Sequence, residues 1–239
     1  MTSIQFDRLI EQDPAAQRRG WLARAWSNAD KGRRLLNLSV AALGIIVALP
    51  IMLLVALAVR LTSNGPVFFT QTRVGLDRRS PSTPAGNCRR RENGGGRPFK
   101  IFKFRTMYAD GSESQVWARA DDPRITPVGR VLRKTRLDEI PQLFNVLKGD
   151  MNIVGPRPEQ PKIFADLRAQ IPGYECRQRV LPGITGWAQI NHHYDTSIED
   201  VRKKLSFDLE YVTRRQSAGH DLEIMAKTMP VMVFKKGAM

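Results

Sequence analysis

Cysteine and negative charge are the two things that this 239-residue sequence has little of. Its two cysteines, Cys88 and Cys176, form neither a metal-binding spacing nor a disulfide framework, so we expect a reducing cytosolic setting. Asp and Glu number 23 against 38 Lys and Arg, which gives a formal charge of +15. Such an excess indicates phosphate-bearing partners: nucleic acid, an anionic membrane surface or phosphorylated small molecules.

Several signals that would direct the interpretation elsewhere are also missing. We expect no cleavable signal peptide, because the first apolar run begins near Leu35 behind a polar leader and is too long for a signal sequence. Three glycines at 94–96 are not followed by Gly-Lys-Ser/Thr, so they do not predict a phosphate loop. The sequence contains no recognised nucleic-acid-binding motif, and its aromatic residues fall in apolar patterns, which disfavours a nucleic-acid partner.

The longest apolar run extends from Leu35 to Val59, 25 residues without a charge, and is long enough to enter a membrane. Pro50 lies inside this run and is expected to kink a helix. Both flanks are basic, although positive residues favour the cytoplasmic side. The residues alone therefore leave open a helix that bends and returns and a helix that spans. The basic residues after the run would face anionic lipid headgroups. The flanking basic residues are Lys31, Arg33, Arg34, Arg60, Arg73, Arg78 and Arg79.

These signals divide the chain into a polar leader at 1–30, a membrane helix at 31–62 and a further domain at 63–239 with a flexible loop at 80–97. Aromatic and β-branched residues on either side of that loop, "GPVFFTQTRVG" and "RPFKIFKFRTM", predict a small β-hairpin. "TPVGRVLRKT" predicts a short helix, and "VRKKLSFDLEYVTRR" an amphipathic one that either packs in the core or lies in the membrane interface. The expected class is α+β and mostly helical, with a kinked membrane helix and interfacial amphipathic helices.

The segment "LDEIPQLFNVLKGDMNIVGPRP" contains the candidate reactive centre. Asp138 and Glu139 precede a proline, a pattern typical of a helix N-terminus, so a capping role explains them as well as a catalytic one. Arg133 and Arg136 lie just before them, and Arg157 stands between two prolines downstream. Guanidinium groups bind phosphate well, so these arginines are candidate phosphate-binding residues.

Two adjacent carboxylates among arginines can perform phosphoryl transfer. An ionised Asp attacks phosphorus without needing a base. Because the substrate diphosphate is itself anionic, cations have to offset the repulsion. Magnesium fits this need, since it prefers carboxylate and phosphate oxygens. We therefore expect Mg²⁺ as the cofactor, held by Glu139 and Asp138.

Residues 31–230 resemble the bacterial sugar transferase family, the monotopic polyprenyl-phosphate phosphoglycosyl transferases. The resemblance rests on the hairpin segments, on "RITPVGRVLRKTRLDEIPQLFNVLKGDMNIVGPRP" and on "PGITGWAQIN". It implies transfer of a sugar-1-phosphate from a UDP-sugar to polyprenyl (undecaprenyl) phosphate, with release of UMP. It further implies that Asp138 is the nucleophile of a phosphosugar-aspartyl intermediate, that Glu139 binds magnesium and that Arg157 contacts phosphate. The family's re-entrant helix bends at a proline that corresponds to Pro50.

The resemblance also implies a bacterial inner-membrane protein with its catalytic domain on the cytoplasmic face, at the first membrane step of a surface glycan pathway. The sequence departs from the family pattern in three places. Leu49 replaces a frequent Ser, Leu181 replaces a frequent basic residue whose role Arg179 could take, and His192-His193 replaces Gly-Arg. An inactive family member that scaffolds glycan assembly is the alternative. The sequence leaves open the sugar, the pathway and whether the chain forms a homo-oligomer.

Overall fold

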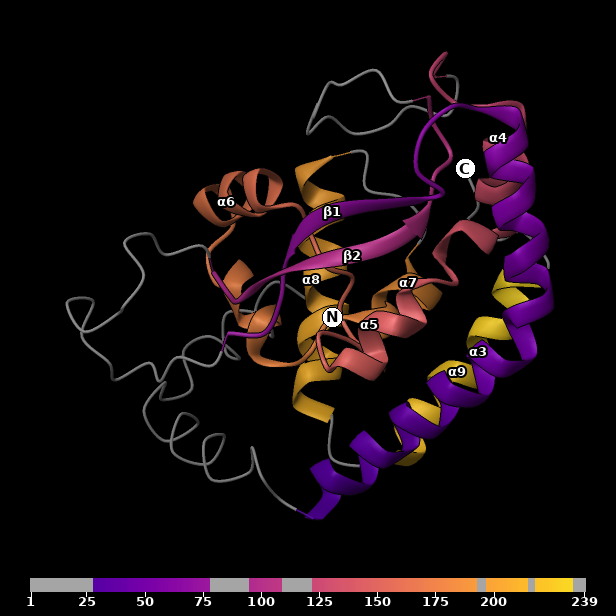
Figure 1. Cartoon of the computed structure of the whole chain (residues 1–239). Coiled ribbons are helices and arrows are strands. Elements are labelled where there is room, and N and C mark those ends of the chain that lie inside the picture. Colours follow the sequence, from indigo (N-terminus) through magenta and orange to yellow (C-terminus); the bar gives the residue numbers. More distant parts are fainter. Residues whose placement is uncertain (1–27, 78–94, 109–121, 193–196, 215–217, 234–239) are drawn as a thin grey trace.

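The computed structural model describes residues 28–77, 95–108, 122–192, 197–214 and 218–233 (Figure 1). These residues are mostly helical, as the sequence predicts, and they also form two two-stranded sheets. The leader and the 80–97 loop lie almost wholly outside the described residues. The elements are α3 (Asn28–Thr62), β1 (Phe68–Val74), β2 (Pro98–Phe104), α4 (Pro127–Thr135), the 3₁₀ turn η2 (Leu137–Glu139), α5 (Gln142–Lys148), β3 (Asn152–Val154), α6 (Pro161–Gln170), the 3₁₀ segment η3 (Tyr174–Arg179), β4 (Gly183–Thr185), α7 (Trp187–Asn191), α8 (Ile198–Arg214) and α9 (Ala218–Val233).

Helix α3 contains the apolar run. Its segment Lys31–Thr62 is long and apolar enough to cross a membrane. An 18-residue stretch within it has a mean hydropathy of 2.9, and only 17% of that stretch is buried in the protein. Figure 1 shows that the two halves of α3 run in different directions, and Pro50 is the proline inside it. A proline within a helix removes a hydrogen bond and clashes with the preceding turn, which accounts for the bend. The large apolar side chains left exposed on it are Leu35, Leu43, Ile46, Val47, Leu49, Ile51, Leu53, Leu54, Leu57 and Leu61.

The first half of α3 is bound to the rest of the protein by polar contacts. Arg34 Nη1 donates to the Val146 carbonyl at 2.9 Å, at the end of α5. Asn37 Oδ1 accepts from the backbone N–H of Ile153 in β3 at 2.6 Å. Arg33 is buried and forms an ion pair with buried Asp221 of α9, with 2.7 Å between Nε and Oδ2. This half of α3 is therefore part of the folded domain.

The second half of α3 packs on a different part of the same domain. Met52, Val55 and Val59 share an apolar cluster with Phe104 of β2 and Leu132 of α4. The chain just beyond the helix is held by the buried Arg105, whose guanidinium donates to the carbonyls of Ser63 at 2.7 Å and Asn64 at 2.9 Å. In Figure 1, α9 lies beside the lower half of α3 and α4 beside the upper half.

The predicted hairpin is confirmed: β1 and β2 pair antiparallel, from Phe68 opposite Phe104 to Val74 opposite Pro98. Asn145 connects this hairpin to its own helix, α5. Its side-chain amide donates to the Lys100 carbonyl at 2.7 Å, and its oxygen accepts from the Phe102 N–H at 3.0 Å. The second sheet, β3 parallel to β4, is not predicted from the sequence.

The amphipathic helix α8 forms where the periodicity predicts it, but its apolar face lies inside the protein. Val201, Leu205 and Val212 are buried, and Leu209 packs against the same interior. The prediction of an interfacial helix is therefore wrong for α8. The reason is that α6, η3 and α8 bury their apolar residues in one cluster, which leaves that face of α8 unavailable to a membrane.

Candidate functional site

The carboxylate pair lies between two helices. Helix α4, whose N-terminus is capped by Thr126, ends at Thr135, and Arg136 then adopts a left-handed conformation with φ 57°. Asp138 and Glu139 follow in η2, and α5 begins only at Gln142. No side-chain hydrogen bond from either carboxylate caps η2 or α5, so the capping interpretation is wrong. Ile140 and Pro141 lie between the carboxylates and the start of α5.

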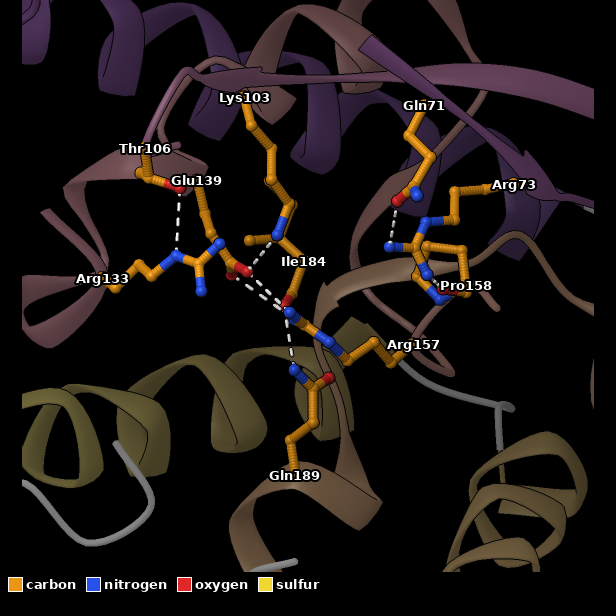
Figure 2. Close-up of polar contacts among 10 residues, drawn as sticks. All are labelled: Gln71, Arg73, Lys103, Thr106, Arg133, Glu139, Arg157, Pro158, Ile184 and Gln189. Atoms are coloured by element: carbon orange, nitrogen blue, oxygen red, sulfur yellow. Dashed lines mark hydrogen bonds and ion pairs between the residues drawn. The ribbon is translucent and has the colours of Figure 1, made fainter. Parts of the chain in front are cut away.

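Glu139 is held between two cations (Figure 2). Its Oε1 accepts from Lys103 Nζ at 2.7 Å and from Arg157 Nη2 at 2.6 Å, and Oε2 lies 3.4 Å from Arg157 Nη1. Burial alone would raise the pKa of Glu139, but Arg157 and Lys103 outweigh it and hold that pKa well below its usual value. Glu139 is therefore ionised in the folded protein. Three elements far apart in the sequence meet here: β2, η2 and the loop after β3.

Asp138 lies in a different environment from its neighbour. It is 8% exposed, and within the described residues its carboxylate forms no hydrogen bond or ion pair. Burial raises its pKa from 3.8 to about 6, against the charge of Lys103, while the adjacent Glu139 raises it further. A carboxylate with little solvation and no fixed partner is a reactive one. The two adjacent residues thus differ in character, one fixed and one free to react.

The predicted phosphate-binding arginines meet only in part at this site. Arg157 contacts Glu139, as described above. Arg133 donates from Nε to Thr106 Oγ1 at 3.0 Å, and its charge acts on Asp138. Arg136 forms the left-handed link before η2. Arg179 ends η3 and is not among the charges that act most strongly on the two carboxylates.

Sequence reasoning missed Lys103. In a strand, alternate residues share a face, so Lys103 of β2 lies on the same face as Phe99 and Ile101, which are buried. A lysine on the apolar face of a strand needs a buried partner. That pattern could have identified Lys103, although it could not have named Glu139 as the partner.

A second residue that the sequence reasoning missed is Arg177, which is fully buried. It donates to the Arg157 carbonyl at 2.9 Å and to Asp208 at 2.9 Å through Nε, and it forms an ion pair with Glu159 at 3.3 Å. Lys204 also contacts Glu159, at 3.0 Å. Arg177 therefore fixes the turn that presents Arg157 through the hydrogen bond to the Arg157 carbonyl.

The turn before Arg157 packs closely against the backbone of β4. Gly155 donates to the Thr185 carbonyl at 2.9 Å, and Gly183 donates to the Pro156 carbonyl at 3.0 Å. A Cβ at Gly155 would collide with the Leu181 carbonyl, so only glycine fits at this approach. Gln189 lies below Arg157 in Figure 2 and donates to the Ile184 carbonyl at 3.1 Å.

The site contains oxygen donors for a hard cation. Glu139 Oε2 has only the long contact of 3.4 Å, and the Asp138 carboxylate is unpaired within the described residues. Magnesium typically binds one or two carboxylates together with substrate phosphates, so these residues fit it. The described residues contain no group of three or more His, Cys, Asp or Glu that could hold a metal, so the two carboxylates would need substrate phosphates to complete a magnesium site. His192 lies just after α7, whereas His193 lies outside the described residues.

Three relatives have sequences similar to this chain over most of its length. The UDP-glucose:undecaprenyl-phosphate glucose-1-phosphate transferase of Escherichia coli (strain K12) is 40% identical over 200 residues, which are 82% of this chain and 39% of that protein. The UDP-N-acetylgalactosamine-undecaprenyl-phosphate N-acetylgalactosaminephosphotransferase of Aeromonas hydrophila is 38% identical over 207 residues, 86% of this chain and 44% of that one. A Caulobacter vibrioides protein named like the first is 38% identical over 208 residues, 85% of this chain and 70% of that protein.

The chain thus spans less than half the length of the E. coli and Aeromonas relatives. The family model described as bacterial sugar transferase matches residues 28–235. That range includes every element from α3 to α9, and with it the long apolar helix and both carboxylates. By this match, the chain belongs to the bacterial sugar transferase family.

Proposed function

We propose that this chain transfers a sugar-1-phosphate from a UDP-sugar to polyprenyl (undecaprenyl) phosphate and releases UMP. One observation is the main support: a buried, unpaired Asp138 lies next to a Glu139 fixed by two cations, in a domain bound to an apolar helix. The names of the relatives, all undecaprenyl-phosphate sugar-phosphate transferases, point to the same donor and acceptor classes.

The reaction proceeds in two displacements. An oxygen of Asp138 attacks the phosphorus that bears the sugar, the bond from that phosphorus to the bridging oxygen breaks, and UMP leaves with the bonding electrons. A phosphate oxygen of the polyprenyl phosphate then attacks the phosphosugar-aspartate. Asp138 leaves as a carboxylate, and the lipid carries the sugar through a diphosphate. Asp138 is the nucleophile of the first step and the leaving group of the second, and UMP leaves before the acceptor reacts, so the kinetics are ping-pong.

The neighbouring charges prepare the site for a diphosphate. Arg157, Lys103 and Arg133 lie around the carboxylates, where they offset the negative charge of the phosphates in both steps. Glu139 holds Arg157 and Lys103 in place. Asp138 and Glu139 would also hold Mg²⁺, which offsets further phosphate charge when bound.

A re-entrant α3, with both flanks on the cytoplasmic face of the inner membrane, is the topology that we propose. It is supported by the contacts of α3 at its two ends: Arg34 reaches the carbonyls of α5, and Arg105 holds the carbonyls that follow the helix. A straight spanning helix would carry one of these contacts to the other side of the bilayer. The bend at Pro50 and the two basic flanks favour the same arrangement.

Thiol labelling tests this topology. The positions Lys31 and Thr72 are exposed on the two sides of the apolar run, and each is changed to Cys in a Cys88→Ser/Cys176→Ser background. A membrane-impermeant reagent should label neither in intact cells and both after permeabilisation. Labelling of just one of them in intact cells would favour a spanning helix.

The activity is tested by exchange. Without any polyprenyl phosphate, the enzyme should convert labelled UMP and an unlabelled UDP-sugar into labelled UDP-sugar. The reason is that UMP can attack the phosphosugar-aspartate and take back the sugar-1-phosphate. With acceptor and magnesium, membranes should release UMP from at least one of UDP-glucose, UDP-galactose or their N-acetylated forms. Net release without exchange would contradict the covalent intermediate. No release from any donor would favour the inactive scaffold.

A further inference from the structure

Arg73 of β1 is a partly buried cation at this site, and within the described residues it has no acidic hydrogen-bond or ion-pair partner. Its Nη2 donates to Gln71 Oε1 at 2.6 Å and its Nη1 to the Pro158 carbonyl at 3.2 Å, both of them neutral acceptors. Within the described residues its Nε is buried and has no hydrogen-bond partner. A buried guanidinium is costly unless an anion compensates it. In the absence of substrate, the partial desolvation of the Arg73 guanidinium is therefore unfavourable in free energy.

The carboxylates whose charge reaches Arg73 are already engaged. Glu159 is bound by Arg177 and Lys204, and Glu139 by Arg157 and Lys103. Burial, followed by repulsion from Arg157, lowers the pKa of Arg73 to about 10, which still leaves it charged at neutral pH. The Arg73 side therefore has an excess of positive charge.

The positions of the cations indicate which ligand group would meet Arg73. In Figure 2, Arg133, the Lys103–Glu139–Arg157 group and Arg73 follow one another across the site. Arg133 and Arg157 act on Asp138, whereas Arg73 is not among the charges that act on it most. A phosphate attacked by Asp138 would lie on the Arg133 side, and a second phosphate joined to it could extend past Arg157 toward Arg73.

We propose that Arg73 binds the phosphate of the donor that is not attacked, the one that leaves as UMP, and that Gln71 positions its guanidinium for this. This inference rests on the proposed function, because it takes the ligand to be a nucleoside diphosphate sugar. Arg73 would gain its first anionic partner when the donor binds, whereas Arg157 already has Glu139. Charge-assisted hydrogen bonds to phosphate then favour donor binding.

The test compares Arg73→Gln, Arg73→Lys and the control Arg202→Gln, which removes an exposed positive charge on α8. Binding of UDP and of inorganic pyrophosphate to the purified full chain is measured by calorimetry, and thermal stability without ligand by fluorescence. We expect Arg73→Gln to weaken both ligands about 10- to 100-fold, as loss of a hydrogen bond to a charged group does. Arg73→Lys should be intermediate, because lysine keeps the charge but not the fork of donors.

Stability separates a binding role from a structural one. Arg73→Gln removes a partly buried charge that has no acidic partner within the described residues, so its melting temperature without ligand should equal or exceed that of the wild type. A fall of several degrees, or a failure to fold, would overturn the proposal, and so would unchanged binding of both ligands by Arg73→Gln. The control should bind like the wild type.

The same measurements distinguish this proposal from the proposed function. If the wild type binds pyrophosphate through Arg73 but releases UMP from no UDP-sugar, the function is wrong and the anion site remains. If UMP release is normal and its KM for the donor is unchanged in Arg73→Gln, the function stands and the role of Arg73 is wrong.

Discussion

Replacing Asp138 with Asn should abolish UMP release and, in metal-free buffer, stabilise the protein. Asp138 is buried, and its pKa is raised from 3.8 to about 6. A shift of one unit corresponds to about 1.4 kcal/mol, so the ionised carboxylate costs on the order of 3 kcal/mol at pH 7.5. For a chain of this size, about 1 kcal/mol corresponds to roughly 2–4 °C in melting temperature. Asp138→Asn should therefore melt roughly 6–12 °C higher at pH 7.5.

The stability difference between Asp138→Asn and the wild type should depend on pH. The folded pKa of Asp138 lies above its unfolded value, so protonation stabilises the folded state. That contribution is fully present below about pH 4 and is lost as the pH rises through about 6. The advantage of Asp138→Asn over the wild type should therefore be largest above pH 6 and shrink toward pH 4. Melting scans in detergent with EDTA, from pH 7.5 to pH 5, measure it.

Two results would refute this reasoning. A melting temperature of Asp138→Asn below that of the wild type at pH 7.5 would mean that the ionised carboxylate has a stabilising partner. UMP release by Asp138→Asn at the wild-type rate would mean that Asp138 is not the nucleophile. The exposed change Glu199→Gln in the first turn of α8 serves as the control, and it should leave UMP release unchanged.

The remaining predictions concern the neighbours of this carboxylate. Glu139→Gln should destabilise the protein by roughly 2 kcal/mol at pH 7.5, because Lys103 and Arg157 lose a shared partner, and melting scans should show a shift opposite to that of Asp138→Asn. Arg177→Lys should lower kcat/KM for UMP release about tenfold, because lysine cannot contact Asp208 and the Arg157 carbonyl together; unchanged kinetics would exclude a positioning role. Arg33→Gln should lower the melting temperature by leaving Asp221 buried without its ion partner, and adding Asp221→Asn should restore most of the loss; no recovery would mean that the ion pair does not fix α3.

Local signals in the sequence predicted the elements but not their partners. The hairpin strands, α4 and α8 follow from β-branched and aromatic runs, from Thr126 followed by proline, and from helical periodicity. The three-residue strands β3 and β4 are too short to show a period, and they pair only because the backbones at Gly155 and Gly183 can approach closely. Long-range pairing of this kind leaves no local pattern.

The structure brings Asp138, Glu139 and Arg157 together, but their local structure differs from the one that the sequence pattern suggests. An Asp-Glu-x-Pro pattern resembles a helix cap, yet both carboxylates lie in η2, and Pro141 stands at the N-cap position of α5. The supporting cations are 36 residues away from Glu139 in the case of Lys103 and 20 residues away from Arg157 in the case of Arg177. Neither separation follows from helical or strand spacing.

Helix α3 and the turn that presents Arg157 are parts of one structural unit. Asn37 of α3 accepts a hydrogen bond from Ile153, and the Tyr211 hydroxyl donates to the carbonyl of the next residue, Val154, at 3.1 Å. The chain then passes through Gly155 and Pro156 to Arg157. In the proposed function, a lipid-linked acceptor would approach from the membrane, and the position of the bilayer relative to the site would depend on α3. Because α3 bonds directly to the strand before Arg157, the orientation of the helix in lipid would then also set the orientation of Arg157.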